Sequence, residues 1–127
     1  MPANVRRIIA VDDDARTLRL VRDVLGTENW HVLTFDDPET ALSYLTDIGP
    51  ADLIILDVEM PNVDGFAIAR TVRAGHHQIP ILALTGSAEP DIAVRILAAG
   101  ADAYLSKSVD IADLRSVARS LLERQAS

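Results

Sequence analysis

An aspartate follows directly after a run of apolar residues of strand length. The run covers residues 53–56, and the acid is Asp57. Four apolar residues suit a strand that is buried on both faces and are too few for a typical helix. A carboxylate at the end of a buried strand is costly unless a ligand or a reaction uses it. Asp57 is therefore the first candidate for chemistry.

Other polar side chains also stand at the ends of apolar runs. They are Asp12 and Asp13 after residues 6–11, Thr85 after residues 79–84, and Lys107 after residues 103–106. Taken singly, an acid here can cap a helix, a threonine can belong to a turn, and a lysine can be a solvated charge. Lys107 is, however, the single lysine of the chain. The shared position of all five residues at strand ends favours one common site.

The apolar runs alternate with helical patterns along the chain. Strands are predicted at residues 6–11, 30–35, 53–56, 79–84 and 103–106, and helices at residues 15–27, 38–46, 64–74, 89–99 and after Asp110 as a cap. Strict alternation implies a parallel sheet with helices on both faces. Five strands favour the flavodoxin-like α/β fold with strand order 2-1-3-4-5. The length predicts one domain, residues 1–127.

This topology predicts where the polar side chains meet. Ligands of such sheets bind at the carboxyl ends of the strands, where the strand order reverses, here between strands one and three. Three carboxylates, Asp12, Asp13 and Asp57, converge there, and like charges repel unless a cation is present. Hard oxygen ligands suit Mg²⁺ or Mn²⁺. With the hydroxyl of Thr85 and the ammonium of Lys107 added, the set suits a phosphoryl group that Asp57 attacks as nucleophile.

The composition limits the class of protein. Hydrophobic residues make up 49% and charged residues 24%, which is typical of a globular domain. The net charge of -7 argues against nucleic acid as a direct partner. The chain has no cysteine, so it has no disulfide and no thiolate metal site. No stretch approaches a membrane span or the core of a signal peptide, and a cytoplasmic protein is expected.

Four motifs in this order resemble the receiver domain of response regulators over essentially the whole chain. They are Val-Asp-Asp-Asp at residues 11–14, Leu-Asp-Val-Glu-Met-Pro-Asn-Val-Asp-Gly at 56–65, Leu-Thr-Gly at 84–86, and Gly-Ala-Asp-Ala-Tyr-Leu-Ser-Lys at 100–107. The resemblance implies that Asp57 accepts a phosphoryl group from the phosphohistidine of a sensor histidine kinase or of a phosphotransfer protein. It implies a signalling domain with slow autodephosphorylation, not an enzyme.

The resemblance also implies roles for individual residues. Asp12, Asp13, Asp57 and the backbone carbonyl of Glu59 would hold Mg²⁺. Thr85 and Lys107 would bind the phosphoryl oxygens. These roles are what the family implies for the matching positions of this chain.

A conformational switch is part of the same resemblance. Tyr104 matches the switch aromatic of the family, which turns inward when Thr85 moves toward the phosphate. The face formed by helix four, strand five and helix five would then change shape and bind a downstream protein or a second copy. In helix four, Ile92, Ile96 and Leu97 are expected to face the core. Val94 and Ala98 would face outward, with Arg115 and Arg119 of helix five nearby.

Several residues carry more than one interpretation. Ser108 replaces the proline that usually follows the site lysine, which leaves either a trans peptide or a strained cis peptide there. Gly86 replaces a common alanine and loosens its loop. Glu59 either influences hydrolysis of the phosphorylated form or is merely solvated, and Ser87 flanks the site. Capping is expected of Asp36 and Asp37, packing of Trp30 and His31, and solvation of His76 and His77.

Two other functions compete with the phosphoacceptor. A haloacid-dehalogenase-type phosphohydrolase needs an aspartate two residues after its nucleophile, and this chain has Glu59 there without a cap domain. An interaction module that works without phosphorylation would not need the full set of site residues. A stand-alone regulator, a piece of a longer regulator and the receiver of a hybrid kinase all stay open.

Overall fold

The computed structural model describes residues 5–47, 51–59, 65–75, 78–86, 90–107 and 111–126. Within these ranges five parallel strands form one sheet in the order β2-β1-β3-β4-β5. The strands are β1 (Arg6–Val11), β2 (Trp30–Phe35), β3 (Leu53–Asp57), β4 (Ile81–Thr85) and β5 (Ala103–Ser106). The helices are α1 (Ala15–Leu25), α2 (Pro38–Asp47), α3 (Gly65–Gly75), α4 (Pro90–Ala98) and α5 (Leu114–Ala126), with a short 3-10 turn η1 (Ile111–Asp113) before α5. The predicted fold class and strand order are confirmed.

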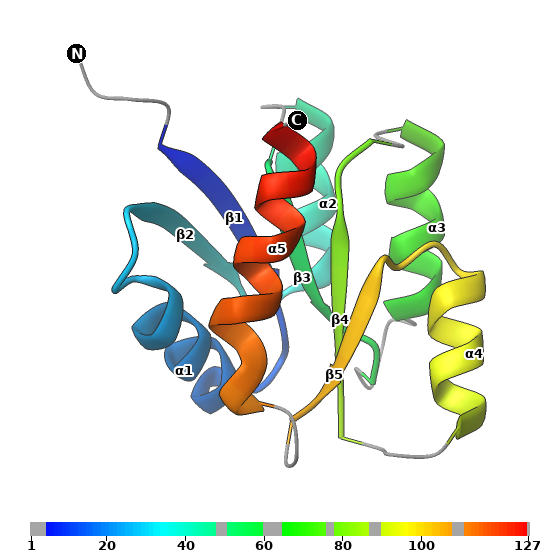
Figure 1. The fold of residues 1–127 in the computed structure, drawn as a ribbon. Coiled ribbons are helices and arrows are strands. Elements are labelled where there is room, and N and C mark those ends of the chain that lie inside the picture. Colours follow the sequence, from blue (N-terminus) through cyan, green and yellow to red (C-terminus); the bar gives the residue numbers. More distant parts are fainter. Residues whose placement is uncertain are drawn as a thin grey trace.

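Two helical layers enclose the sheet. Helices α1 and α5 cover one face, and α2, α3 and α4 cover the other (Figure 1). Alternate residues of β1 enter the two layers: Ile8 and Ala10 pack with α1 and α5, whereas Ile9 and Val11 pack on the opposite side. This explains why the strand sequences are continuous apolar runs, because both faces of a parallel sheet are buried.

Several element boundaries differ from the prediction. Strand β4 begins at Ile81, two residues later than expected, since Pro80 has no amide hydrogen to give to the sheet. Helix α1 ends at Leu25 and not at residue 27. Gly26 caps this end, and its amide donates to the carbonyl of Arg22. Gly75 is the last residue of α3; among the described glycines, positive φ occurs at Gly100 instead. These differences move no predicted site residue away from its strand end.

Two helix caps are present. Asp14 precedes α1, and its carboxylate accepts a hydrogen bond from the amide of Arg16 at 2.9 Å. Asp37 precedes α2 and accepts from the amide and hydroxyl of Thr40, as expected for that residue. The predictions for Asp64, His76, His77, Ser87, Ser108 and Asp110 lie outside the described residues.

The two aromatic residues predicted to open β2 behave differently. Trp30 is partly buried and packs against the core beneath α1 and α5, as predicted. His31 is exposed, so the expectation that packing explains it is wrong. The physical reason is the alternation of side chains along a strand, which places neighbouring residues on opposite faces of the sheet. No helix in the described ranges has the length and apolar character needed to cross a membrane.

An arginine ties the amino ends of β4 and β5 to α3. The guanidinium of Arg73 donates to the carbonyls of Gly100 and Ile79 and pairs with the carboxylate of Asp102. Asp102 in turn accepts the amide of Ile81 at 2.8 Å. Gly100 has a φ of 115° and passes so close to the arginine that a Cβ there would lie 2.6 Å from its Cγ. This network fixes the end of the sheet opposite to the predicted site.

We predict that Arg73→Lys lowers the free energy of unfolding by about 1–3 kcal/mol, because a single ammonium cannot reach three acceptors in the planar geometry of a guanidinium. Urea denaturation measures the loss. Arg70→Lys on the same helix is the matched control, since Arg70 is exposed, and it should change stability by less than about 0.5 kcal/mol. Equal losses for both variants would contradict a special role for Arg73.

Candidate functional site

Four strands deliver the predicted side chains to one edge of the sheet. Asp12 follows β1, Asp57 ends β3, Thr85 ends β4 and Lys107 follows β5. Asp12 and Asp57 are 2% exposed and Thr85 is 1% exposed, whereas Asp13 points to solvent. Because all strands are parallel, their carboxyl ends lie on the same side, so residues from four distant parts of the sequence meet there.

Three of the four predicted metal ligands form a cluster of carboxylates. Asp12, Asp13 and Asp57 each place one carboxylate oxygen within 4.8 Å of the other two. Asp12 Oδ1 accepts the amide of Asp14 at 2.8 Å, and Asp57 Oδ1 accepts the amide of Glu59 at 3.0 Å. The backbone therefore orients both buried carboxylates, and a hard cation is the natural partner of such an oxygen set.

Lys107 supplies the positive charge of the site. Its Nζ lies 2.9 Å from Asp12 Oδ2 and 3.5 Å from Asp57 Oδ2. Within the described part of the chain Asp12 Oδ2 accepts no regular hydrogen bond, so this ion pair is what compensates its burial. Burial alone would lower the pKa of Lys107, but the contact with Asp12 and the charges of both aspartates outweigh it and raise the pKa above its usual value. The lysine is therefore held charged at neutral pH.

The burial of Asp57 changes its acidity. Loss of solvation raises the pKa of Asp57 from 3.8 to about 6, and the neighbouring Asp12 acts in the same direction. The amide of Glu59 and the ammonium of Lys107 oppose the rise without cancelling it. A carboxylate kept in an unfavourable environment next to like charges is typical of a functional position.

The side chain of Glu59 has a contact that the sequence analysis did not predict. Its Oε1 accepts the hydroxyl of Thr85 at 2.7 Å and also the amide of Gly86. Glu59 is exposed, as the solvated interpretation expects, but its carboxylate also accepts these two hydrogen bonds. Its influence on hydrolysis stays a prediction. A signal was present in the register: Asp57 pairs with Leu84, and continuing two residues further places Glu59 beside Gly86.

The predicted switch aromatic points outward. Tyr104, on β5, is 42% exposed. On α4, Ile96 is buried and Ile92 partly so, and Val94 and Ala98 are exposed as expected. Leu97 is 48% exposed, so its predicted place in the core is wrong. The core side of α4 instead continues from Ile96 to the buried Ala99, three residues on.

The two arginines expected beside α4 lie elsewhere. Arg119 pairs with Glu28, and Arg115 lies 3.9 Å from the same carboxylate and 3.5 Å from the carbonyl of Val24. Glu28 follows α1, which packs beside α5 on one face of the sheet, whereas α4 covers the other face (Figure 1). The expectation that these arginines adjoin the α4 surface is therefore wrong.

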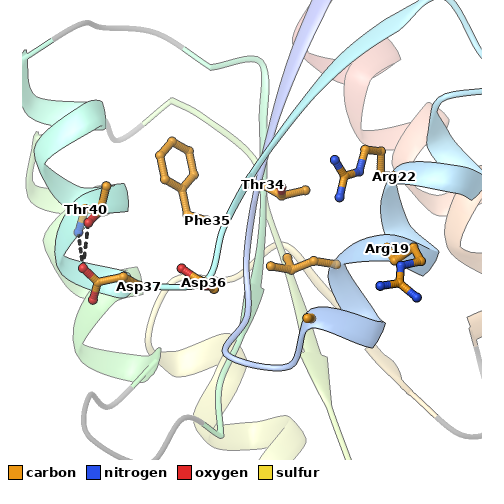
Figure 2. A pocket seen from close by; sticks show the side chains of 9 residues that line it. Arg19, Arg22, Thr34, Phe35, Asp36, Asp37 and Thr40 are labelled. Atoms are coloured by element: carbon orange, nitrogen blue, oxygen red, sulfur yellow. Dashed lines mark hydrogen bonds between the residues drawn. The ribbon is translucent and has the colours of Figure 1, made fainter.

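A hollow of about 460 Å³ lies apart from this cluster, between α1 and the start of α2. Arg19 and Arg22 of α1 stand on one side of it, and Asp37 and Thr40 on the other (Figure 2). Asp37 is occupied there by the hydrogen bond with Thr40 that caps α2. The residues that line the hollow include none of the predicted site residues.

Comparison with known proteins identifies the family. The family model described as the response regulator receiver domain matches residues 8–119. The chain belongs to this family. Receiver domains are signalling domains of two-component systems, and the predicted recognition and class of function are thereby confirmed at that level.

Individual relatives agree with this assignment. The chain is 36% identical over 101 residues to the cell cycle transcriptional regulator CtrA of Caulobacter vibrioides. The aligned segment covers 80% of the chain and 43% of CtrA. It is 35% identical to the transcriptional regulatory protein PrrA of Mycobacterium tuberculosis, which covers 95% of the chain and 52% of PrrA. The receiver domain thus spans about half the length of these curated relatives.

Solved receiver domains share the fold. A CheY-like response regulator receiver domain protein from Methanospirillum hungatei superposes with a TM-score of 0.88 and 26% identity, covering 97% of this chain and 98% of that one. The BeF3-activated receiver domain of DrrB from Thermotoga maritima has a TM-score of 0.84 and 28% identity, covering 94% and 99%. These likenesses show that the chain has the receiver-domain fold.

The raised pKa of Asp57 predicts a pH-dependent cost in the metal-free protein. Well below pH 3.8 the carboxyl is protonated in both folded and unfolded chains and costs nothing. As the pH rises through 3.8 toward about 6, the unfolded chain loses its proton first, so folded stability falls. In EDTA, Asp57→Asn should therefore be more stable than the unsubstituted protein by about 1–2 kcal/mol at pH 7, allowing for solvent screening.

Urea denaturation across pH 4–8 measures this difference, which should shrink toward pH 4. Asp36→Asn, an exposed acid at the end of β2, is the control and should show no such trend. A stability difference for Asp57→Asn that stays constant over the whole range would contradict the prediction.

Proposed function

We propose that residues 1–127 act as the phosphoacceptor domain of a two-component or phosphorelay system. Asp57 would take a phosphoryl group from the phosphohistidine of a histidine kinase or of a histidine phosphotransfer protein. The observation that carries the proposal is the position of Asp57, buried at the end of β3 with Lys107 3.5 Å from its carboxylate. Family membership supports the same role, since the chain matches the receiver domain over residues 8–119.

The proposed reaction transfers a phosphoryl group from a histidine nitrogen to an oxygen of Asp57. A carboxylate oxygen of Asp57 attacks phosphorus, the P–N bond of the phosphohistidine breaks, and its electron pair stays on the donor imidazole. Lys107 and the hydroxyl of Thr85 would bind the oxygens of the transferred group and stabilise the charge that they carry in the transition state. Slow attack of water on phosphorus would later release phosphate and restore the carboxylate.

A divalent cation belongs to this proposal, with Mg²⁺ preferred and Mn²⁺ possible in its place. The donor set fits: three carboxylates converge, Asp12 and Asp57 are buried, and Asp13 is exposed on the open side. Asp12, Asp13, Asp57 and the backbone carbonyl of Glu59 would hold the ion. When bound, it neutralises phosphoryl oxygens and the repulsion between the aspartates. The protein side chains supply the remaining positive charge through Lys107.

The output would be read from the α4-β5-α5 surface. Val94 and Leu97 of α4 are 67% and 48% exposed, and Tyr104 of β5, the strand that contacts α4, is exposed as well. Movement of Thr85 toward the phosphate, with Tyr104 turning inward, would change this surface for a downstream protein or a second copy. A cytoplasmic protein without direct contact to nucleic acid or membrane completes the proposal.

Incubation with acetyl phosphate and Mg²⁺ tests the proposal by intact mass. We expect one added phosphoryl group on the unsubstituted protein and none on Asp57→Asn. Asp36→Asn is the matched control, because this exposed aspartate ends a strand outside the cluster, and it should still be modified. An unmodified but folded protein would favour the alternative of an interaction module that works without phosphorylation. Rapid turnover of many phosphate esters would favour a phosphohydrolase.

Metal binding has a separate readout in stability. Mg²⁺ at 100 times its dissociation constant should raise the free energy of unfolding by about 2.7 kcal/mol, because only the folded chain assembles the carboxylates. Asp13→Asn should reduce this gain and leave the stability in EDTA nearly unchanged, since Asp13 is exposed. Urea denaturation with Mg²⁺ or EDTA measures both. An equal gain in the Asp12→Asn/Asp13→Asn double variant would place the metal elsewhere.

A further inference from the structure

The carboxylate of Glu59 occupies the donors at the end of β4. Thr85 Oγ1 donates to Glu59 Oε1 at 2.7 Å, and the amide of Gly86 donates to the same oxygen. Thr85 is 1% exposed, so water has little access to its hydroxyl as an alternative partner. Two donors that converge on one anionic oxygen form a small cradle for such an oxygen.

The hydroxyl of Thr85 cannot serve two acceptors at once. A threonine hydroxyl carries one hydrogen and donates one hydrogen bond, and a backbone amide likewise donates one. Under the proposed function, Thr85 donates to an oxygen of the phosphoryl group on Asp57. The bond from Thr85 to Glu59 must therefore break before the bond to the phosphoryl group forms.

Charge acts in the same direction as this competition. Glu59 lies two residues after Asp57, and the amide of Glu59 donates to the Asp57 carboxylate at 3.0 Å. A phosphoryl group on Asp57 would therefore bring anionic oxygens close to Glu59. Like charges this close repel. The phosphoryl group thus both replaces the carboxylate of Glu59 as acceptor and disfavours its presence.

We propose that Glu59 is a positioning residue that holds Thr85 and Gly86 in the unphosphorylated protein and competes with the phosphoryl group for the hydroxyl of Thr85. It sets how far the equilibrium lies toward the unswitched form, in which Tyr104 is exposed. The bond lost on switching makes the phosphorylated arrangement less populated than it would be without the glutamate. This inference rests on the proposed function and assigns the side chain of Glu59 a role in it.

A double-substitution cycle with a phosphoryl mimic tests the inference. Beryllofluoride with Mg²⁺ is titrated by calorimetry into the unsubstituted protein, Glu59→Ala, Thr85→Val and the double variant. Loss of a charge-assisted competitor should strengthen beryllofluoride binding by roughly 5- to 30-fold in Glu59→Ala. In the Thr85→Val background the gain should shrink at least about threefold, since the contested hydroxyl is absent.

The cycle separates the competition from a general effect of charge. If Glu59→Ala strengthens binding equally with threonine and with valine at position 85, Glu59 acts through its charge alone and the inference is wrong. No gain, or weaker binding, in Glu59→Ala also overturns it. Glu59→Gln, which keeps the shape and a neutral acceptor, should give an intermediate gain. Circular dichroism checks that every variant is folded.

A second cycle examines the contact without any phosphate. In EDTA, Glu59→Ala and Thr85→Val should each lower the urea midpoint, and the double variant should lose less than the sum of the two, because both single substitutions remove the same hydrogen bond. Additive losses would contradict the contact. If the unsubstituted protein binds no beryllofluoride and takes no phosphoryl group from acetyl phosphate, the proposed function fails and this inference fails with it. Binding by the unsubstituted protein without coupling overturns the inference alone.

Discussion

The ion pairs of Lys107 compensate the carboxylate cluster of Asp12, Asp13 and Asp57 at the carboxyl ends of the strands, here called the acidic edge of the sheet. The ammonium of Lys107 lies 2.9 Å from Asp12 and 3.5 Å from Asp57, two carboxylates that the fold removes from water. A buried charge without compensation is strongly destabilising, and a charged partner that is itself partly desolvated reduces that cost only in part. The pKa of Asp57 stays raised because the contact with Lys107 does not fully offset the loss of solvation. The negative charge of the site is therefore only partly compensated, which favours the binding of a cation.

The two ends of the sheet differ in how well their charged groups are paired. At the amino ends of β4 and β5, Arg73 and Asp102 satisfy one another and the surrounding backbone, and Gly100 provides the close approach that they need. At the carboxyl ends, carboxylates face one another and the pKa of Asp57 is raised. Charges that are fully paired and carboxylates that repel one another thus lie at opposite ends of one sheet. A helix-covered parallel sheet allows this, because all its strands end on the same side.

The link between Glu59 and Thr85 connects the acidic edge to the rest of the domain. Thr85 ends β4, β4 pairs with β5, and β5 carries Tyr104. Thr85 pairs with Ser106 of β5, so the contact with Glu59 lies at the end of this strand pair. The contact is made by side chains of residues 26 positions apart, so it exists only when β3 and β4 are correctly paired. Both strands that carry this contact belong to one continuous hydrogen-bonded sheet.

The amino-acid sequence by itself determined the alternation of strands and helices, the strand order and the residues that reach the acidic edge. Apolar runs buried on two faces leave few alternatives, and parallel strands bring their ends together by topology alone. Tertiary structure decided what the sequence pattern could not: that Glu59 bonds Thr85, that Leu97 is exposed, and that His31 faces solvent.

The arginines of α5 show the physical reason for this division. Arg115 and Arg119 follow the helical period, which predicts that they share one face of α5 but not which neighbour that face meets. Packing against α1 brought them to Glu28, far from α4. Periodicity is a local property that a short stretch of sequence carries, whereas the partner of a side chain depends on the rotation and packing of whole elements. The acidic edge could be predicted because backbone topology positions it; the contacts of Glu59, Leu97 and Arg119 could not, because side-chain packing decides them.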